Sequence, residues 1–200
     1  GTLTVNASRT YNTSGTSVVT TVTGILVNKG TVSGSTTKLS FASGGTYQHN
    51  RDAGTIPTAT WNANSTCEIT GVTTDRGSGE TQAFGHFTWN SSGQTASISL
   101  GTGFAVTNAI QGNLTIQNTG STDVFFTTTA EGTATINGNL VISGGQLGIA
   151  SSSTVNRTVA VLGNFSMSGG TIDMSPTAKI GIINVSGGFS HSGGTITETS

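Results

Sequence analysis

The sequence predicts an all-β protein, folded as a right-handed parallel β-helix (β-solenoid) with coils of about 24–27 residues, within the range typical of solenoid repeats. Two observations lead to this prediction. The composition favours strands over helices, and a twelve-residue phrase recurs at regular spacing along the second half of the chain. A β-sandwich is the alternative fold that the same composition allows.

Thr, Ser and Gly dominate the 200-residue chain, with 39, 25 and 30 copies respectively. Thr is β-branched, and β-branched residues favour strands. Good helix formers are sparse, and they never follow the i, i+3, i+4, i+7 spacing of an amphipathic helix. The chain is 32% hydrophobic, which is too apolar for a disordered segment. The composition therefore predicts a chain folded into strands.

Charge and hydropathy exclude several partners. Charged residues make up 8% of the chain, and the net charge is −1. The seven Lys and Arg residues are scattered along the sequence and form no basic stripe, so we expect neither nucleic acid nor an anionic membrane surface as a partner. No apolar run approaches the roughly 18 residues of a membrane span, so we expect no membrane insertion.

The recurring phrase reads GNLVISGGQLGI at 138–149, GNFSMSGGTIDM at 163–174 and GGFSHSGGTITE at 187–198. Its first glycine belongs to a series whose spacing falls by one at each step: Gly85, Gly112, Gly138, Gly163 and Gly187. Apolar residues stand two positions before and two positions after these glycines, and four positions after each of them except Gly187, where His191 stands. Because a period of two places residues on one face of a strand, we expect three core columns. The columns are Ile110, Ile136, Val161 and Val185; Leu114, Leu140, Phe165 and Phe189; and Ile116, Ile142 and Met167.

A glycine pair follows the first strand in each phrase, and a second short strand follows the pair. Glycine permits the positive φ of a sharp corner. A repeat of roughly 20–50 residues without helices indicates stacked coils, each about 4.8 Å from the next. A sandwich would instead need antiparallel hairpins with tight turns such as Asn-Gly. The one Asn-Gly pair, Asn137-Gly138, lies inside the repeat.

Residues 46–90 read differently from the repeats. Both tryptophans, two of the three histidines and six charged residues occur there. We therefore expect a single module over residues 1–200, with regular coils at 83–200 and an irregular, insert-like stretch at 46–90.

The stretch 46–90 also holds the candidate binding residues. Enzymes that cleave glycans use clustered carboxylates or a basic residue beside a metal site, and exposed aromatic rings bind sugars. The candidates are Tyr47, His49, Arg51, Asp52, Trp61, Asp75, Arg76 and Glu80. The other interpretation is that these side chains satisfy turns and fill the core. We expect no catalytic residues, no metal site and no cofactor, since the carboxylates are too few and too scattered to favour a calcium site.

The phrases GGTYQHNRDAGTIPTATW (44–61), STCEITGV (65–72) and FGHFTWN (84–90) resemble a recurrent module of large, secreted, repetitive surface proteins of Bacteroidota. Those proteins look like cargo of the type IX secretion system. The resemblance implies an extracellular, cell-surface location and an adhesin-like or stalk-like role. It implies no catalytic residues, and the sequence contains no recognisable sorting domain of the kind that such proteins carry.

The sequence thus favours a non-enzymatic, structural or adhesive segment of a cell-surface fibre. Both ends of the sequence read as strands in mid-pattern, so the expected partners are neighbouring copies or modules of the same protein that stack end to end. The alternative is a module that binds, or less plausibly cleaves, surface glycans. Ice binding would need Thr-x-Thr motifs at one phase of the repeat, and Thr21-Val22-Thr23 and Thr133-Ala134-Thr135 do not share a phase.

Overall fold

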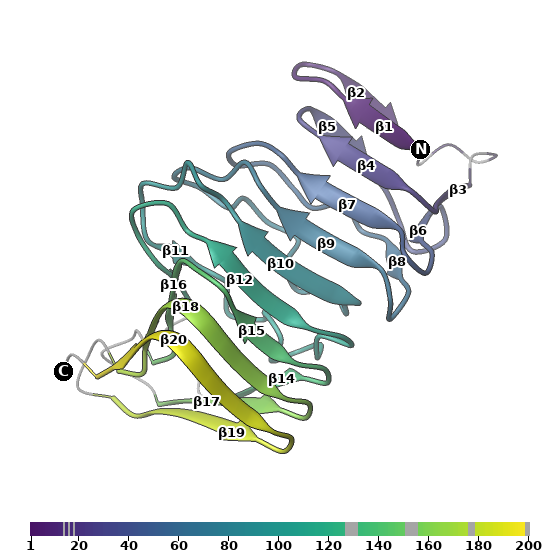
Figure 1. The fold of residues 1–200 in the computed structure, drawn as a ribbon. Coiled ribbons are helices and arrows are strands. Elements are labelled where there is room, and N and C mark those ends of the chain that lie inside the picture. The colour runs from purple at the N-terminus through teal and green to yellow at the C-terminus, as the bar shows by residue number, and fades with distance from the viewer. Residues whose placement is uncertain are drawn as a thin grey trace.

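The computed structural model describes residues 1–13, 15, 17, 19–126, 132–150, 156–175 and 179–198, which form strands and turns but no helix. The chain winds into a β-solenoid of about eight turns, and it advances steadily from one end to the other (Figure 1). Every strand pair among the described residues is parallel. The predicted β-solenoid is therefore confirmed, and the antiparallel sandwich is excluded. Nowhere in these ranges is there a helix long and apolar enough to cross a membrane.

One face of the solenoid, the first face, runs along the whole molecule and receives one strand from each turn (Figure 1). From the N-terminal end its strands are β1 (Thr2–Val5), β4 (Ile25–Asn28), β7 (Thr46–His49), β9 (Thr66–Ile69), β10 (His86–Asn90), β12 (Leu114–Asn118), β15 (Leu140–Ile142) and the first parts of β18 (Phe165–Asp173) and β20 (Phe189–Thr197). Along β7, β10 and β12, buried and partly exposed residues alternate, as expected for strands with one face in a core.

The other two faces are less continuous. The second face holds β2 (Thr10–Asn12), β5 (Thr31–Ser33), β11 (Ile98–Ser99), β13 (Val124–Phe125), β16 (Gln146–Gly148) and the second parts of β18 and β20. The third face holds β3 (Thr20–Val22), β6 (Leu39–Phe41), β8 (Thr60–Trp61), β14 (Thr133–Ile136), β17 (Arg157–Val161) and β19 (Gly181–Val185). At the corner between the first and second faces, the second glycine of each predicted pair has a positive φ: 69° at Gly145, 75° at Gly170 and 85° at Gly194.

The core residues stack in register through the interior. Leu114 lies opposite Leu140, which lies opposite Phe165, and Phe165 lies opposite Phe189. Ile116, Ile142 and Met167 form the parallel column two residues further along. On the third face the column runs through Ile110, Ile136, Val161 and Val185. All of these residues are buried except Phe189 and Val185, which lie at the C-terminal end.

A ladder of aromatic rings continues the core toward the N-terminal end. Trp61 stacks on Phe41 with ring centroids 4.3 Å apart, and the contacts continue through Phe84, Phe87 and Phe104 at 4.9–5.2 Å. Aromatic pairs of this kind add to the stabilisation from buried area. The stretch that the sequence sets apart therefore supplies much of the core.

The N-terminal coils are shorter than expected. The first-face column keeps the predicted spacing from Phe87 to Phe189, but every step between Leu3 and Phe87 is shorter than any step beyond Phe87. The members of the column are Leu3, Leu26, Tyr47, Cys67, Phe87, Leu114, Leu140, Phe165 and Phe189. The third-face strands β3, β6 and β8 have two or three residues, whereas β14, β17 and β19 have four or five. The shorter third-face strands contribute to this difference.

The stretch 46–90 is accordingly not an insert on the first face, because β7, β9 and β10 pair in register with one another and with β4 and β12. Its irregular part is confined to the other faces. There, residues 50–97 contribute the short strand β8 and a single bridge between Thr55 and Ser78. Because the C-terminal coils have a longer repeat spacing, that spacing does not reveal the continuous first face over residues 46–90 in the sequence.

A column of small residues begins each first-face strand. Gly24, Gly45, Gly85, Gly112, Gly138, Gly163 and Gly187 all stand two residues before the core column, and Ser65 takes this place in one coil. A Cβ at Gly138 would lie 2.6 Å from the backbone of Gly112, so the coils approach too closely for a side chain. Beside this column, the backbone N–H of Asn139 donates to Oδ1 of Asn113 (2.9 Å), and that of Asn164 donates to Oδ1 of Asn139 (2.8 Å).

Candidate functional site

Two of the candidate residues, Tyr47 and His49, lie inside the core rather than in a site. Both are fully buried on β7. Asn28 Nδ2 donates to the Tyr47 hydroxyl (2.8 Å), which lies 3.1 Å from His49 Nδ1, and His49 Nε2 lies 2.8 Å from the carbonyl oxygen of Ala53. These hydrogen bonds are mutually consistent when the Tyr47 hydroxyl donates to His49 Nδ1 and His49 Nε2–H donates to the Ala53 carbonyl. The tautomer is therefore fixed by its partners, and the imidazole is neutral.

Burial also governs the titration of these two groups. Desolvation lowers the pKa of His49 below its usual value, despite the opposing hydrogen bond to Ala53. Desolvation raises the pKa of Tyr47 well above its usual value. Neither group is in reach of a ligand, and both are held in their neutral forms.

Arg51 and Asp52 lie at the corner that follows β7, and they fasten this coil to its neighbours on both sides. The Arg51 guanidinium donates to the Gly30 carbonyl in the preceding coil. Asp52 Oδ1 accepts the backbone N–H groups of Thr73, Thr74 and Asp75 in the following coil, at 2.8–2.9 Å. The Thr74 hydroxyl donates to Oδ2 (2.9 Å).

This arrangement explains the acidity of Asp52. Partial burial raises its pKa, but the hydrogen bonds from Asp75, Thr73 and Thr74 together outweigh burial and hold the pKa well below its usual value. The carboxylate is ionised and already engaged by donors from the protein. Asp52 is therefore a fastening between coils.

Asp75, Arg76 and Glu80 lie in the next coil, beyond the same corner. Asp75 Oδ1 accepts the backbone N–H of Gly77 (2.8 Å), and Arg76 Nη1 lies 2.6 Å from Glu80 Oε1. Arg76 also donates to the Gly77 carbonyl (3.0 Å). These contacts are all local, and they shape the turn between residues 75 and 80.

Trp61 lies on β8 of the third face, whereas Arg51 follows β7 of the first face. One face of its indole packs on Phe41, and the ring of Phe84 packs against it at 5.0 Å with an interplanar angle of 68°. Its Nε1–H donates to Gln82 Oε1 (3.0 Å), while Gln82 Nε2 donates to the carbonyls of Pro57 and Gly79. The indole is partly buried against the core, and it lines an open hollow of about 380 Å³ together with Thr58, Thr60 and Asn108.

The structure thus brings Arg51, Asp52 and Asp75 together at one corner, and it separates them from Trp61. Of the eight candidates, Tyr47, His49 and Asp52 are engaged by partners within the protein, and Arg76 is paired with Glu80. Across the described ranges, no group of three or more His, Cys, Asp or Glu side chains is placed to hold a metal ion.

An open apolar surface lies at the C-terminal end of the stack. A hollow of about 380 Å³ is lined by Phe165, Met174, Ile183, Val185, Phe189 and Ile196. Phe189 is 62% exposed, although Leu114, Leu140 and Phe165 of the same column are buried. Within the described residues, β20 pairs only with β18 and β19 only with β17, so their outer edges are open.

The opposite end has the same features. Leu3 of β1 is 47% exposed, and a hollow of about 330 Å³ reaches Tyr11, Val22 and Leu26. Among the described strands β1 pairs only with β4. The sequence carried a signal for this coil, because Gly1-Thr2-Leu3 repeats the phase of Gly24-Ile25-Leu26 and Gly45-Thr46-Tyr47.

Comparisons of the chain with protein-family models, curated proteins and solved structures found no match.

Proposed function

We propose that the chain is a structural and adhesive segment of an extracellular cell-surface fibre or stalk, in which β-solenoid coils stack end to end. The observation that carries this proposal is the pair of open end coils. At both ends the first-face column finishes on an exposed apolar residue, Leu3 or Phe189, beside a hollow and unpaired strand edges.

A second copy of the chain fits these ends in one orientation. Gly1-Thr2-Leu3 and Gly187-Gly188-Phe189 share the same phase of the coil, since the glycine stands two residues before the column in both. Strand β1 of one copy can therefore lie beside β20 of another as a further parallel strand, with Leu3 on Phe189. Burying such side chains contributes about 1.5–3 kcal/mol each. A contact between two different ends of the molecule propagates into a filament.

The interior contacts favour this proposal over glycan binding through residues 46–90. The hydrogen-bonding groups of His49 and Asp52 are directed to neighbouring residues or coils, as described above. Their arrangement strengthens cohesion along the stack. The resemblance of residues 44–61 to modules of secreted surface proteins supports the extracellular location.

Sedimentation of the 200-residue protein over a wide concentration range tests the proposal. We expect concentration-dependent self-association, and we expect Phe189→Asp to abolish it by placing a charge in the C-terminal hollow. Leu162→Asp is the matched control, because Leu162 is 52% exposed and follows β17 rather than lying on the last strand. A wild-type protein that stays monomeric throughout, or equal effects of the two variants, would overturn the proposal.

A further inference from the structure

Three cations that are far apart in the sequence meet at one corner of the first three coils. Arg9 follows β1, Lys29 follows β4 and Arg51 follows β7. The backbone N–H of Thr31, next to Gly30, donates to the Arg9 carbonyl (2.8 Å), and the Arg51 guanidinium donates to the carbonyl of Gly30. The backbones of Arg9 and Lys29 and the guanidinium of Arg51 therefore lie close to Gly30, and we call this set of residues the basic corner.

The coil length explains why the sequence shows no basic stripe. The steps from Arg9 to Lys29 and from Lys29 to Arg51 are each close to one turn of the N-terminal coils. The winding of the chain therefore places these basic residues, which are scattered in the sequence, in successive coils with a rise of about 4.8 Å per coil. Three coils span about 10 Å, which is comparable with the Debye length of about 8–10 Å near physiological salt, so the three charges act together.

Cations outnumber carboxylates at the basic corner, where Asp52 follows Arg51 and Asp75 lies one coil further on. No Asp or Glu precedes Asp52, and all eight acidic residues of the chain lie from Asp52 onward. The one ion pair found among the described residues joins Arg76 to Glu80. The nearest carboxylate in sequence, Asp52, faces the amides of residues 73–75. Arg9 and Lys29 are exposed.

We propose that the basic corner binds an anionic polysaccharide, a polymer that carries carboxylate or sulfate groups along an extended chain. Exposed polar residues, Asn6 and Ser8, lie beside the cations and can bond sugar hydroxyls. A single small anion would gain little from exposed cations in water, whereas a polymer engages the whole row and releases its counterions. The inference rests on the adhesive part of the proposed function and is independent of end-to-end stacking.

A nucleic acid fits this surface less well. Duplex DNA carries one charge per about 1.7 Å of axis, much denser than one cation per coil. Proteins that bind single strands also present aromatic rings on which bases stack. Tyr11 is partly buried and its hydroxyl lies 2.9 Å from Oγ1 of Thr20, while Trp61 lies on the third face with one face of its indole covered by Phe41.

The test measures binding of the 200-residue protein to immobilised polygalacturonate and to dextran sulfate, each at about 50 and about 200 mM salt. Fully methyl-esterified polygalacturonate and neutral dextran are the uncharged controls. We expect binding to the charged polymers only, weakened roughly tenfold by the higher salt. Arg9→Gln and Lys29→Gln should each weaken it about fivefold. Among the described contacts, neither the Arg9 nor the Lys29 side chain makes a hydrogen bond or an ion pair. The thermal unfolding midpoint of each variant should therefore equal that of the wild type.

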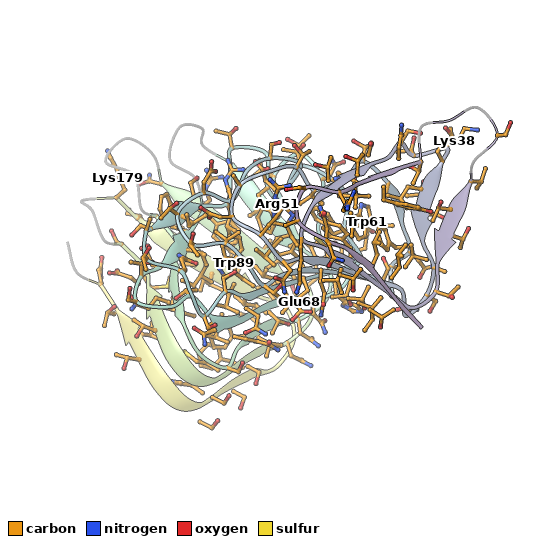
Figure 2. All side chains as sticks on the ribbon, turned by 90° about the horizontal axis from the view of Figure 1, so that it is seen from above. Lys38, Arg51, Trp61, Glu68, Trp89 and Lys179 are labelled. Atoms are coloured by element: carbon orange, nitrogen blue, oxygen red, sulfur yellow. The ribbon has the colours of Figure 1, made fainter. Side chains whose placement is uncertain are left out.

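Lys179→Gln is the matched control, because it removes the same charge near the opposite end of the molecule, far from Arg51 (Figure 2). We expect it to leave binding unchanged. Equal binding to the uncharged polymers, or equal effects of Lys29→Gln and Lys179→Gln, would overturn the inference. Tighter binding of single-stranded poly-dT that depends equally on Arg9 and Lys29 would assign the corner to nucleic acid instead. Self-association is measured separately, so failure here leaves the stacking proposal standing.

Discussion

At the scale of single residues, each tryptophan has its indole N–H satisfied by a glutamine that also joins other segments. Trp61 donates to Gln82, and Trp89 donates to Gln94 (2.8 Å). Gln94 is buried, and its Nε2 donates to the carbonyls of Ala96 and Asp123 and lies 3.1 Å from Oγ1 of Thr122. The amide therefore bridges two coils inside the core.

Replacing this amide should be costly. Gln94→Leu leaves the buried Trp89 N–H without its partner and removes one of the two hydrogen bonds to the Asp123 carbonyl, so we expect a loss of about 2 kcal/mol in the free energy of unfolding. Urea denaturation measures the loss. Gln111→Leu removes an amide whose two hydrogen bonds, to the Ala109 carbonyl and from Asn137 Nδ2, are both exposed, and it should cost less than about 0.5 kcal/mol. Similar losses for the two variants would contradict the role assigned to Gln94.

The buried His49 predicts a pH dependence of stability. Its pKa is lower in the folded protein than the usual 6.5, so the unfolded chain binds more protons as the pH falls through and below that value. The free energy of unfolding should therefore be greatest above about pH 6.5 and fall between about pH 7 and pH 5. His49→Gln should show a shallower fall over the same range, by denaturation at each pH. A variant with the same slope as the wild type would contradict the assignment.

At the scale of the strands and corners, the C-terminal coils could be predicted from the sequence because their period is long and regular. The column through Leu140 and Phe165 follows from the spacing of Gly138 and Gly163 alone. The N-terminal coils carry the same Gly-x-apolar phase, but Ser65 interrupts the glycine series, and the coils are shorter. An alignment anchored on the longer period therefore misses them.

For a related reason, the sequence alone could not decide whether the candidate residues bind a ligand or instead satisfy turns and fill the core. The partners of Asp52 lie in the next coil, and the partner of Arg51 lies in the preceding coil. Residue type indicates binding chemistry, but only the register shows that the protein itself supplies the ligands. The sequence does not reveal the basic corner for the same reason, because its residues also lie about one coil apart.

The glycine column is the element on which close stacking of the corners depends. Gly138→Ala would place a Cβ 2.6 Å from the backbone of Gly112 and 2.6 Å from Asn113 Oδ1, so the coils would have to shift. We expect a loss of about 1–3 kcal/mol in unfolding free energy. Gly93→Ala is the control, because its nearest neighbour would be a methyl group of Thr73 at 3.6 Å. If both variants unfold at the same denaturant concentration, close packing at the column is not the cause.

At the scale of the whole molecule, cohesion runs along one axis. Each coil contacts mainly the coils before and after it, so every interior coil is covered on both sides and the two end coils are not. The exposure of Phe189, which contrasts with the burial of Leu140 and Phe165 in the same column, is a direct consequence. A further coil of the same type is the surface that best covers it.

Charge is also distributed along this axis. The segment that ends at Arg51 carries four of the seven cations and no acidic residue. Contact between two N-terminal ends would bring like charges together, whereas contact between an N-terminal and a C-terminal end would not. The charge distribution therefore favours the same head-to-tail orientation as the phase of Gly1 and Gly187.

Disulfide trapping between copies tests this account most directly. Thr4 and Ser190 occupy the same outward column of the first face, so stacking in register would place their Cα atoms about 4.8 Å apart, within the range for a disulfide. Native Cys67 is fully buried and should not react. After oxidation of a mixture of Thr4→Cys and Ser190→Cys proteins, we predict a mixed dimer and little of either homodimer. Ser166→Cys, one coil further in, should not trap Thr4→Cys. Homodimers of Ser190→Cys as the main product, or no trapped product at all, would contradict head-to-tail stacking.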